Sequence, residues 1–193
     1  MTQVVLATRN RGKLADVRHL LHEHGVTFDL IAAIDLDLPD IEETGSTFEE
    51  NARLKAVTTA SLTQLPALAD DSGLEVDALG GAPGVYSARY AGLPSSDQRN
   101  NEKLLAELSH LRDRTARFHS VVAYATPDGR VLVAHGTCEG HILAAPRGTQ
   151  GFGYDPLFYC AELGKTFGEA TIAEKARVSH RARAMAKLAP QLV

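Results

Sequence analysis

Hydrophobic positions along the chain follow two different spacings. Short apolar or alternating runs, which are typical of strands, occur at residues 4–7, 28–34, 67–70, 74–78, 118–126, 130–136 and 156–160. Apolar residues three or four positions apart, which are typical of one helix face, occur at residues 13–24, 48–62, 97–111 and through much of 171–192. The acidic stretch 35–46 is expected to form a loop, and residues 137–143 to extend the sheet.

The order of these elements predicts the fold class. Helices alternate with strands, and the turn sequence Pro127-Asp128-Gly129 joins two strand candidates as a hairpin. Such an order is typical of a mixed α/β fold, with helices flanking a mixed sheet. The chain has 193 residues and no internal repeat or linker-like stretch, so we expect a single domain over residues 1–193.

The composition is that of an ordinary globular protein, with 44% hydrophobic and 23% charged residues. No apolar run approaches the roughly 18 residues of a membrane-spanning helix, and no signal-peptide pattern opens the chain. Cys138 and Cys160 fit a reduced cytoplasmic protein better than a disulfide framework, although one disulfide stays compatible with the sequence. The net charge of -4 argues against a broad nucleic-acid surface and allows a local cationic pocket.

A polar loop, Thr-Arg-Asn-Arg-Gly-Lys at residues 8–13, connects the first strand to the first helix. Backbone N–H groups at a helix start favour anions, and Lys13 adds a positive charge there. The spacing is not that of the phosphate-binding motif G-x-x-x-x-G-K-[ST]. From its residues alone, the loop is equally compatible with phosphate binding and with a simple polar connection.

Lys55 interrupts the apolar face of the second helix. Phe48, Ala52 and Ala56 share that face with it, because residues three and four apart lie one above another on a helix. A long lysine side chain readily reaches past apolar neighbours to solvent, and the spacing alone favours this interpretation. The alternative is a lysine aimed into a cleft, together with Asn51 one turn earlier.

Two carboxylates, Asp70 and Asp71, follow a short apolar run. They are compatible with a turn that begins at a strand end and continues through Ser72. They are equally compatible with a site for Mg²⁺, which prefers oxygen ligands. Adjacent strand residues point to opposite faces, so we expect only one of the two to face such a site.

Two later stretches also allow two interpretations. Residues 151–156, Gly-Phe-Gly-Tyr-Asp-Pro, form either a loop with a packed Phe or a wall against which a base stacks. Lys175 precedes the sequence Ser179-His180-Arg181, in which Ser179 is a suitable N-cap for a final helix. Without further information, a solvated basic helix is favoured there over donors aimed at a carbonyl or phosphate.

Together, these motifs and their order resemble the inosine triphosphate pyrophosphatases, also called XTP/dITP diphosphatases. The resemblance covers nearly the whole chain and rests on residues 6–13, 43–45, 47–52, 55–56, 69–74, 80–90, 151–156 and 179–181. It implies a long mixed sheet flanked by helices, with two lobes and a central cleft. It also implies hydrolysis of noncanonical purine nucleoside triphosphates (ITP, dITP and XTP) to the monophosphate and pyrophosphate, which clears deaminated purines from the nucleotide pool.

The resemblance implies roles for individual residues. Asp71 is expected to orient or deprotonate the attacking water and to bind Mg²⁺, with Glu42 favoured over Glu43 as the second metal ligand. Phe152 is expected to stack on the base, and His180 and Arg181 to donate to a 6-oxo purine. The residues expected to bind substrate are Thr8, Arg9, Asn10, Arg11, Gly12, Lys13, Lys55, Ser72, Phe152, Gly153, Tyr154, Asp155, Lys175, His180 and Arg181.

The resemblance has further implications and two departures. Mg²⁺ is the implied cofactor, and a homodimer without nucleic-acid or membrane partners is the implied assembly. Arg9 stands where many members carry Gly, and Asp16 stands where Glu is usual. Neither change is expected to abolish the site.

Two other functions fit the sequence less well. A pyrophosphatase for other altered nucleotides, such as the Maf-like enzymes, is disfavoured by the motifs around Phe152 and His180. A nucleotide-binding sensor without catalysis is disfavoured by Asp71 with the nearby Glu42 and Glu43, because a pure binder gains little from carboxylates beside phosphates unless a metal is present.

Overall fold

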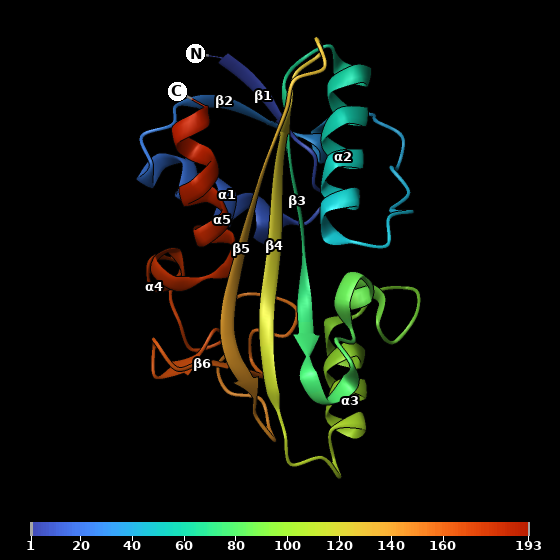
Figure 1. Cartoon of the computed structure of the whole chain (residues 1–193), viewed down its shortest axis with the longest axis vertical. Coiled ribbons are helices and arrows are strands. Elements are labelled where there is room, and N and C mark those ends of the chain that lie inside the picture. The colour runs from blue at the N-terminus through green and yellow to red at the C-terminus, as the bar shows by residue number, and fades with distance from the viewer. Residues whose placement is uncertain (1, 193) are drawn as a thin grey trace. The chain divides into compact units, whose positions relative to one another are not determined.

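The computed structural model describes residues 2–192, and this part of the chain forms one sheet with flanking helices (Figure 1). The strands are β1 (Thr2–Leu6), β2 (Phe28–Ala32), β3 (Ala67–Val76), β4 (Thr115–Ala125), β5 (Val131–Ile142), β6 (Phe158–Cys160) and β7 (Lys165–Thr166). The α-helices are α1 (Arg11–Glu23), α2 (Phe48–Thr63), α3 (Asp97–Glu107), α4 (Ile172–Val178) and α5 (His180–Leu188). Short 3₁₀ helices are η1 (Ala33–Asp35), η2 (Asp77–Leu79), η3 (Gly84–Arg89) and η4 (Ala189–Gln191).

The sheet confirms the predicted mixed α/β class. Its strand order is β2-β1-β3-β4-β5-β6-β7. β1 pairs in parallel with both β2 and β3, with Val4 opposite Leu30 and Val5 opposite Ala67. β6 pairs antiparallel with both β5 and β7. Parallel and antiparallel pairs therefore occur in one sheet.

β3 and β5 are longer than the sequence pattern predicted. Residues 67–70 and 74–78 were expected as two strands, and that expectation is wrong, because β3 runs without a break from Ala67 to Val76. Eight of its ten residues are buried. Ser72 and Gly73 are thus extended within the strand, although the pair Ser-Gly is typical of a turn. β5 likewise joins residues 131–142 in one strand.

Local capping sets where the helices begin. Asn10 caps α1, and its side-chain oxygen accepts hydrogen bonds from the backbone N–H groups of Gly12 and Lys13. At the start of α2, Thr47 and Glu50 form a reciprocal capping box. This box confirms the helix start that the sequence predicted at that point.

The chain divides into two compact units. Unit 1 comprises the residues up to Asp71, with Ser120–Gly136 and the stretch from Arg181 onward. Unit 2 comprises Ser72–His119 and Thr137–His180. The single domain and the cleft between two lobes that the sequence suggested stay predictions.

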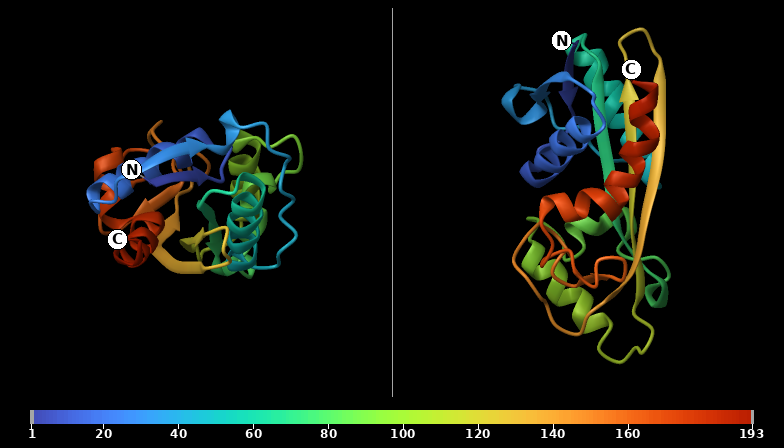
Figure 2. Two further views of the ribbon diagram at one scale, coloured as in Figure 1. Left: turned by 90° about the horizontal axis from the view of Figure 1, so that it is seen from above. Right: turned by 90° about the vertical axis from the view of Figure 1, so that its left-hand side faces the viewer.

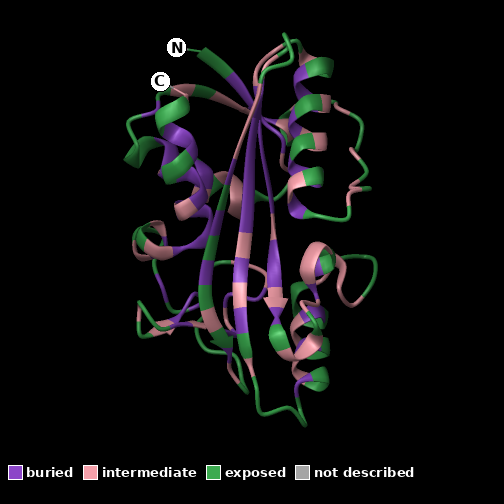
Figure 3. Ribbon diagram, in the orientation of Figure 1, coloured by how far each residue is buried: buried purple, intermediate pink, exposed green. Residues whose placement is uncertain are grey.

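Unit 1 places helices on both faces of its strands. In Figure 1 and in the left-hand view of Figure 2, α2 (teal) and α5 (red) lie on opposite sides of the strands. Figure 3 shows that these strands are mostly buried, and Val4, Val5 and Leu68 are fully so. Sheet positions that alternate in direction therefore meet α2 on one face and α1 with α5 on the other.

Unit 2 has a hydrophobic core of its own, with aromatic rings at its centre. The ring centroid of Phe118 lies 4.6 Å from that of Phe158 and 5.8 Å from that of Phe167. The same core contains Cys138 and Cys160, whose sulfur atoms are 3.8 Å apart and not joined by a disulfide. The disulfide that the sequence left open is therefore not formed.

Within residues 2–192, every helix falls short of the length and apolar content that a bilayer crossing requires.

Truncation of Phe118 tests whether the aromatic cluster stabilises unit 2. We expect Phe118→Ala to lower the free energy of unfolding by about 3–5 kcal/mol, because it leaves a cavity among packed rings. Leu93→Ala is the control, since Leu93 is 76% exposed, and its change should stay within about 0.5 kcal/mol. Urea unfolding followed by circular dichroism measures both, and equal changes for the two variants would contradict this account of the core.

Candidate active site

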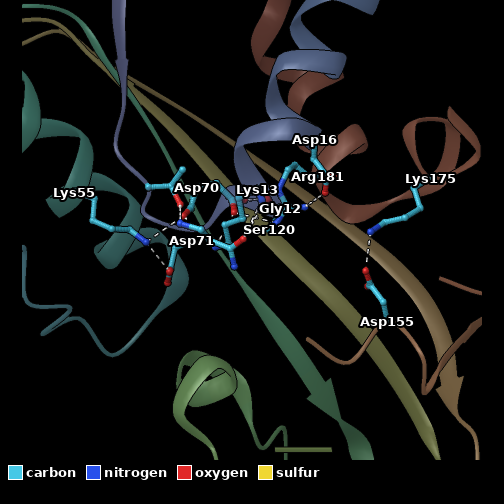
Figure 4. Close-up of polar contacts among 12 residues, drawn as sticks. Gly12, Lys13, Asp16, Lys55, Asp70, Asp71, Ser120, Asp155, Lys175 and Arg181 are labelled. Atoms are coloured by element: carbon cyan, nitrogen blue, oxygen red, sulfur yellow. Dashed lines mark hydrogen bonds and ion pairs between the residues drawn. The ribbon is translucent and has the colours of Figure 1, made fainter. Parts of the chain in front are cut away.

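Two adjacent aspartates on β3 contact the positively charged side chains of unit 1. Asp70 is 1% exposed and Asp71 is 6% exposed. Figure 4 shows their side chains pointing to different faces of the strand. Asp70 contacts Lys13 of α1 and Arg181 of α5, whereas Asp71 contacts Lys55 of α2. The two side chains thus point in opposite directions, as expected of adjacent strand residues, and which of them faces a metal stays a prediction.

Asp70 lies in a buried cluster of charges. Its Oδ2 is 2.9 Å from Lys13 Nζ and 3.1 Å from Arg181 Nη2, and its Oδ1 accepts a hydrogen bond of 2.5 Å from Ser120 Oγ. Burial by itself would raise the pKa of this carboxyl, but the charges of Arg181 and Lys13 hold the pKa of Asp70 well below its ordinary value. Asp70 is therefore an anion that fixes two cations, rather than a group that exchanges protons.

Arg181 is held by carboxylates from two elements. Its Nη1 lies 2.8 Å from Asp16 Oδ2 on α1, while its Nη2 reaches Asp70 on β3. Only 2% of its side chain is exposed. A guanidinium suits this arrangement because its N–H groups point in fixed directions. The contacts that the structure gives Arg181 thus tie α5 to α1 and to the sheet.

Lys55 joins two acidic side chains on the other face. Its Nζ lies 2.8 Å from Asp71 Oδ1, 2.8 Å from Glu43 Oε1 and 3.0 Å from the backbone oxygen of Asp70. Only 12% of the lysine side chain is exposed. The interpretation that spacing alone favoured, a lysine reaching past its neighbours to solvent, is therefore wrong.

The pKa values of Asp71 and Lys55 are both raised, with different consequences for the two groups. Burial raises the pKa of Asp71 above its ordinary value, and Glu43 acts in the same direction, against the charges of Lys55 and Lys13. Burial alone would lower the pKa of Lys55, but Asp71 and Glu43 raise it. Lys55 thus stays charged, and Asp71 is a carboxylate with increased affinity for a proton, as a general base needs.

Several polar contacts of the loop at residues 8–13 are made within the loop itself. Asn10 Oδ1 accepts from the N–H groups of Gly12 at 2.8 Å and Lys13 at 3.1 Å, and Thr8 Oγ1 accepts from Asn10 N–H. Arg9 donates to the backbone oxygen of Leu38. Arg9 and Arg11 have exposed side chains. Lys13 is the loop residue whose charge reaches the Asp70 cluster.

The acidic side chains are the candidates for holding Mg²⁺, which prefers oxygen ligands. Within residues 2–192, no group of three or more His, Cys, Asp or Glu side chains is arranged around a common metal position. Glu43 and Asp71 nevertheless place one carboxylate oxygen each beside the same ammonium group. Mg²⁺ commonly takes one or two protein carboxylates and fills its remaining positions with water and phosphate. This pair fits that donor set, whereas Glu42 has an exposed side chain.

In unit 2, Asp155 and Lys175 form a second buried ion pair, which Figure 4 also shows. Lys175 Nζ lies 2.8 Å from Asp155 Oδ2, and the same oxygen accepts a hydrogen bond of 3.0 Å from Phe152 N–H. The ammonium lies 5.4 Å from the ring centroids of both Phe152 and Phe167. Lys175 and Asp155 therefore fix the loop that carries Phe152, whose ring is partly exposed.

Other expected substrate residues of unit 2 have structural contacts. Gly153 accepts a hydrogen bond from Asn101 and donates one to Asp97. Tyr154 donates its hydroxyl hydrogen to the backbone oxygen of Ser87. The ring of His180 stacks on that of Phe118 at 4.7 Å and is 4% exposed. Ser72 is partly buried on β3.

Sequence reasoning missed two members of the Asp70 cluster. Asp16 was noted only as a replacement for Glu, and Ser120 was not singled out. Asp16 follows Lys13 by three positions on α1, so the two share a helix face, and that spacing was the available signal. Ser120 lies inside an apolar strand, and nothing in its local sequence marks it.

Neutralising Asp70 tests the cluster. We expect Asp70→Asn to lower the free energy of unfolding by about 3 kcal/mol, because it leaves the Arg181 and Lys13 charges buried without their shared anion. The exposed Asp37→Asn is the control, with an expected change within about 0.5 kcal/mol. Urea titration measures both, and a cost for Asp70→Asn as small as that of the control would refute the proposed balance of charges.

A pair of glycines tests the loop that carries Phe152. Gly151 has φ +76°, and a Cβ there would lie 1.9 Å from Asp155 Oδ2, whereas Gly153 has φ +62° and a Cβ there would meet no atom within 4 Å. Both alanine variants adopt a strained backbone, at a cost of about 1–2 kcal/mol. Gly151→Ala must also displace Asp155 from Lys175, so thermal unfolding should show a clearly larger loss than for Gly153→Ala. Equal losses would mean that the Asp155 contact does not fix the loop.

Comparisons with known proteins agree with this fold. The Ham1 family model matches residues 4–191. The chain is 54% identical over 189 residues to the dITP/XTP pyrophosphatase of Syntrophobacter fumaroxidans, covering 96% of this chain and 79% of that protein. It is 51% identical over 195 residues to the dITP/XTP pyrophosphatase of Geobacter sulfurreducens, covering 100% and 97% of the two chains.

Solved structures give the same result. The Ham1 protein of Staphylococcus aureus superposes with a TM-score of 0.86 at 43% identity, covering 99% of this chain and 98% of that chain. A HAM1 protein of Coxiella burnetii superposes with a TM-score of 0.88 at 44% identity, covering 100% and 98%. Sequence and fold therefore agree along nearly the whole length, and the chain belongs to the Ham1 family.

Proposed function

We propose that this chain is a nucleoside triphosphate pyrophosphohydrolase that acts on purine nucleotides with deaminated bases. Its substrates are ITP, dITP and XTP, and its products are the nucleoside monophosphate and pyrophosphate. Relatives that are 54% and 51% identical to this chain carry the name dITP/XTP pyrophosphatase, which supports the assignment. Removal of such nucleotides keeps deaminated purines out of the nucleotide pool.

The observation that carries the proposal is the environment of Asp71. This carboxylate is nearly buried, has a raised pKa and lies beside a charged lysine. A base with increased proton affinity removes a proton from water more effectively than an ordinary aspartate does. Positive charge next to it stabilises the negative charge that develops on a phosphoryl group.

The reaction assigned to this arrangement is a single displacement. Asp71 accepts a proton from water as the water oxygen bonds to the α-phosphorus. The bond from that phosphorus to the oxygen bridging the α and β phosphates breaks, and pyrophosphate leaves with the bonding electrons. We propose that Lys55 and Lys13 neutralise the phosphate oxygens, and that Asn10 and the exposed Arg9 and Arg11 extend the phosphate-binding surface.

Mg²⁺ is proposed as the cofactor. When bound, it neutralises charge on the triphosphate, which carries about four negative charges. The sequence favoured Glu42 as the second ligand beside Asp71. We propose Glu43 for that role, because Glu43 shares the ammonium group of Lys55 with Asp71.

Base recognition is proposed for Phe152 of unit 2. The partly exposed ring of Phe152 suits stacking on a purine. A donor facing the base favours a 6-oxo purine, because the 6-amino group of adenine leaves that donor without an acceptor. The assignment of this role to His180 and Arg181 stays a prediction. A homodimer and a cytoplasmic location also remain part of the proposal.

The test is pyrophosphate release in the presence of Mg²⁺, with ITP, dITP, XTP, GTP, ATP and TTP at equal concentration. We expect strong preference for the first three nucleotides and release of pyrophosphate rather than phosphate. Equal activity on GTP or TTP would overturn the account of base recognition. Nucleotide binding without release from any of the six would assign the chain to the sensors.

Asp71→Asn provides the matched variant for this assay. We expect kcat to fall by about 10²- to 10⁴-fold, the usual contribution of a general base, while the nucleotide still binds in equilibrium dialysis. Asp37→Asn, at an exposed position, should leave kcat unchanged. Full turnover by Asp71→Asn would assign the proton transfer to another group.

A further inference from the structure

Lys55 is the shared counter-ion of the two carboxylates that fit a divalent metal. Its Nζ lies 2.8 Å from Glu43 Oε1 and 2.8 Å from Asp71 Oδ1, with the backbone oxygen of Asp70 at 3.0 Å. The side chains of Lys55 and Asp71 are 12% and 8% exposed, and that of Glu43 is 27% exposed. The ammonium thus sits among three oxygen atoms, as a small cation would.

A metal and this ammonium compete for the same oxygen atoms. A divalent ion bound to Glu43 and Asp71 would lie within a few ångströms of the lysine charge, and like charges at such a separation in a poorly solvated site repel strongly. The lysine would also lose the carboxylate contacts that offset its burial. In the absence of nucleotide, a metal ion therefore has to displace the Lys55 ammonium from Glu43 and Asp71.

A triphosphate changes this balance because it offers Lys55 other anionic oxygens. We propose that Lys55 exchanges partners on substrate binding. In the resting chain it neutralises Glu43 and Asp71. When the substrate binds, the ammonium moves to the phosphates, and both carboxylates become available to the metal that accompanies the nucleotide. The inference rests on the proposed function and concerns the order in which that site assembles. It makes the affinities for metal and nucleotide mutually dependent, and such coupling is reciprocal by thermodynamic necessity.

Lys13 of α1 supplies a matched comparison, because it contacts the neighbouring aspartate of β3. Its ammonium lies 2.9 Å from Asp70 Oδ2 and is 15% exposed, so it resembles Lys55 in charge and burial. Its carboxylate partner is Asp70, which points to the opposite face of β3. Loss of Lys13 therefore removes one positive charge nearby without releasing Glu43 and Asp71.

The first experiment measures metal binding without nucleotide. Mn²⁺ is titrated into the full chain, and free Mn²⁺ is followed by electron paramagnetic resonance. We expect Lys55→Met to bind Mn²⁺ about tenfold more tightly than the parent chain, within the usual range of coupling between sites. Lys13→Met should change the affinity by less than about threefold. Lys55→Gln, which removes the charge and keeps N–H donors, serves the same purpose if Lys55→Met does not fold.

The second experiment repeats the titration with a non-hydrolysable α,β-methylene analogue of ITP. We expect the nucleotide to raise the Mn²⁺ affinity of the parent chain by about tenfold beyond its effect on Lys55→Met. Loss of this difference, or Mn²⁺ affinities of Lys55→Met and Lys55→Gln no higher than that of the parent chain, would overturn the exchange. Equal tightening by Lys13→Met would overturn it too, because general charge loss would then explain the result.

The two proposals fail in distinguishable ways. If the parent chain releases pyrophosphate from ITP but Lys55→Met binds Mn²⁺ no better, the proposed function stands and the exchange is wrong. If Lys55→Met binds Mn²⁺ more tightly but the parent chain releases pyrophosphate from none of the nucleotides, the proposed function is wrong, and the competition between Lys55 and metal stands.

Discussion

A carboxylate inside a protein must be neutralised where it stands, and unit 1 is organised around that requirement at Asp70. The neutralising groups come from places far apart in the sequence: Lys13 near the start, Ser120 in the middle and Arg181 close to the end. Each brings its own element to β3. Removing a charge from water costs several kcal/mol unless such partners are in place. The cluster therefore favours one arrangement of α1, α5 and the sheet over looser packings with the same hydrophobic contacts.

Asp70 and Asp71 show how environment alone assigns different chemistry to identical neighbours. Asp70 has two cations and a hydroxyl, and its pKa falls. Asp71 has one close ammonium, which it shares with Glu43, and its pKa rises. Burial acts in the same direction on both, so the nearby charges decide the outcome. Arg181 and Lys13 outweigh burial at Asp70, whereas burial and Glu43 together outweigh the cations at Asp71. One aspartate is thereby suited to hold structure, and the other to accept a proton.

Local features of this chain were readable from its sequence, and distant partners were not. The capping box of Thr47 and Glu50 involves residues three apart, and it marked the start of α2 correctly. Lys55 was judged from its helix face, but its acidic partners lie 12 and 16 residues away, outside any periodic pattern. The resemblance to a family singled out Lys55 as a substrate residue, but it did not indicate which side chains Lys55 contacts. Asp16 and Arg181 are separated by 165 positions, so only the folded chain reveals that pair.

Because the two aspartates point to opposite faces of β3, the register of this strand decides which carboxylate meets Lys55 and which meets Arg181. Side chains of a strand alternate with a period of two, so a shift of one residue sends every side chain to the other face. One residue inserted between Ala67 and Asp70 would present Asp70 to Lys55 and would leave a neighbour to face Arg181. Surface loops commonly tolerate inserted residues, whereas an insertion in β3 would change the direction of its side chains. The number of strand residues before Asp71 thus decides which carboxylate meets Lys55 in the candidate active site.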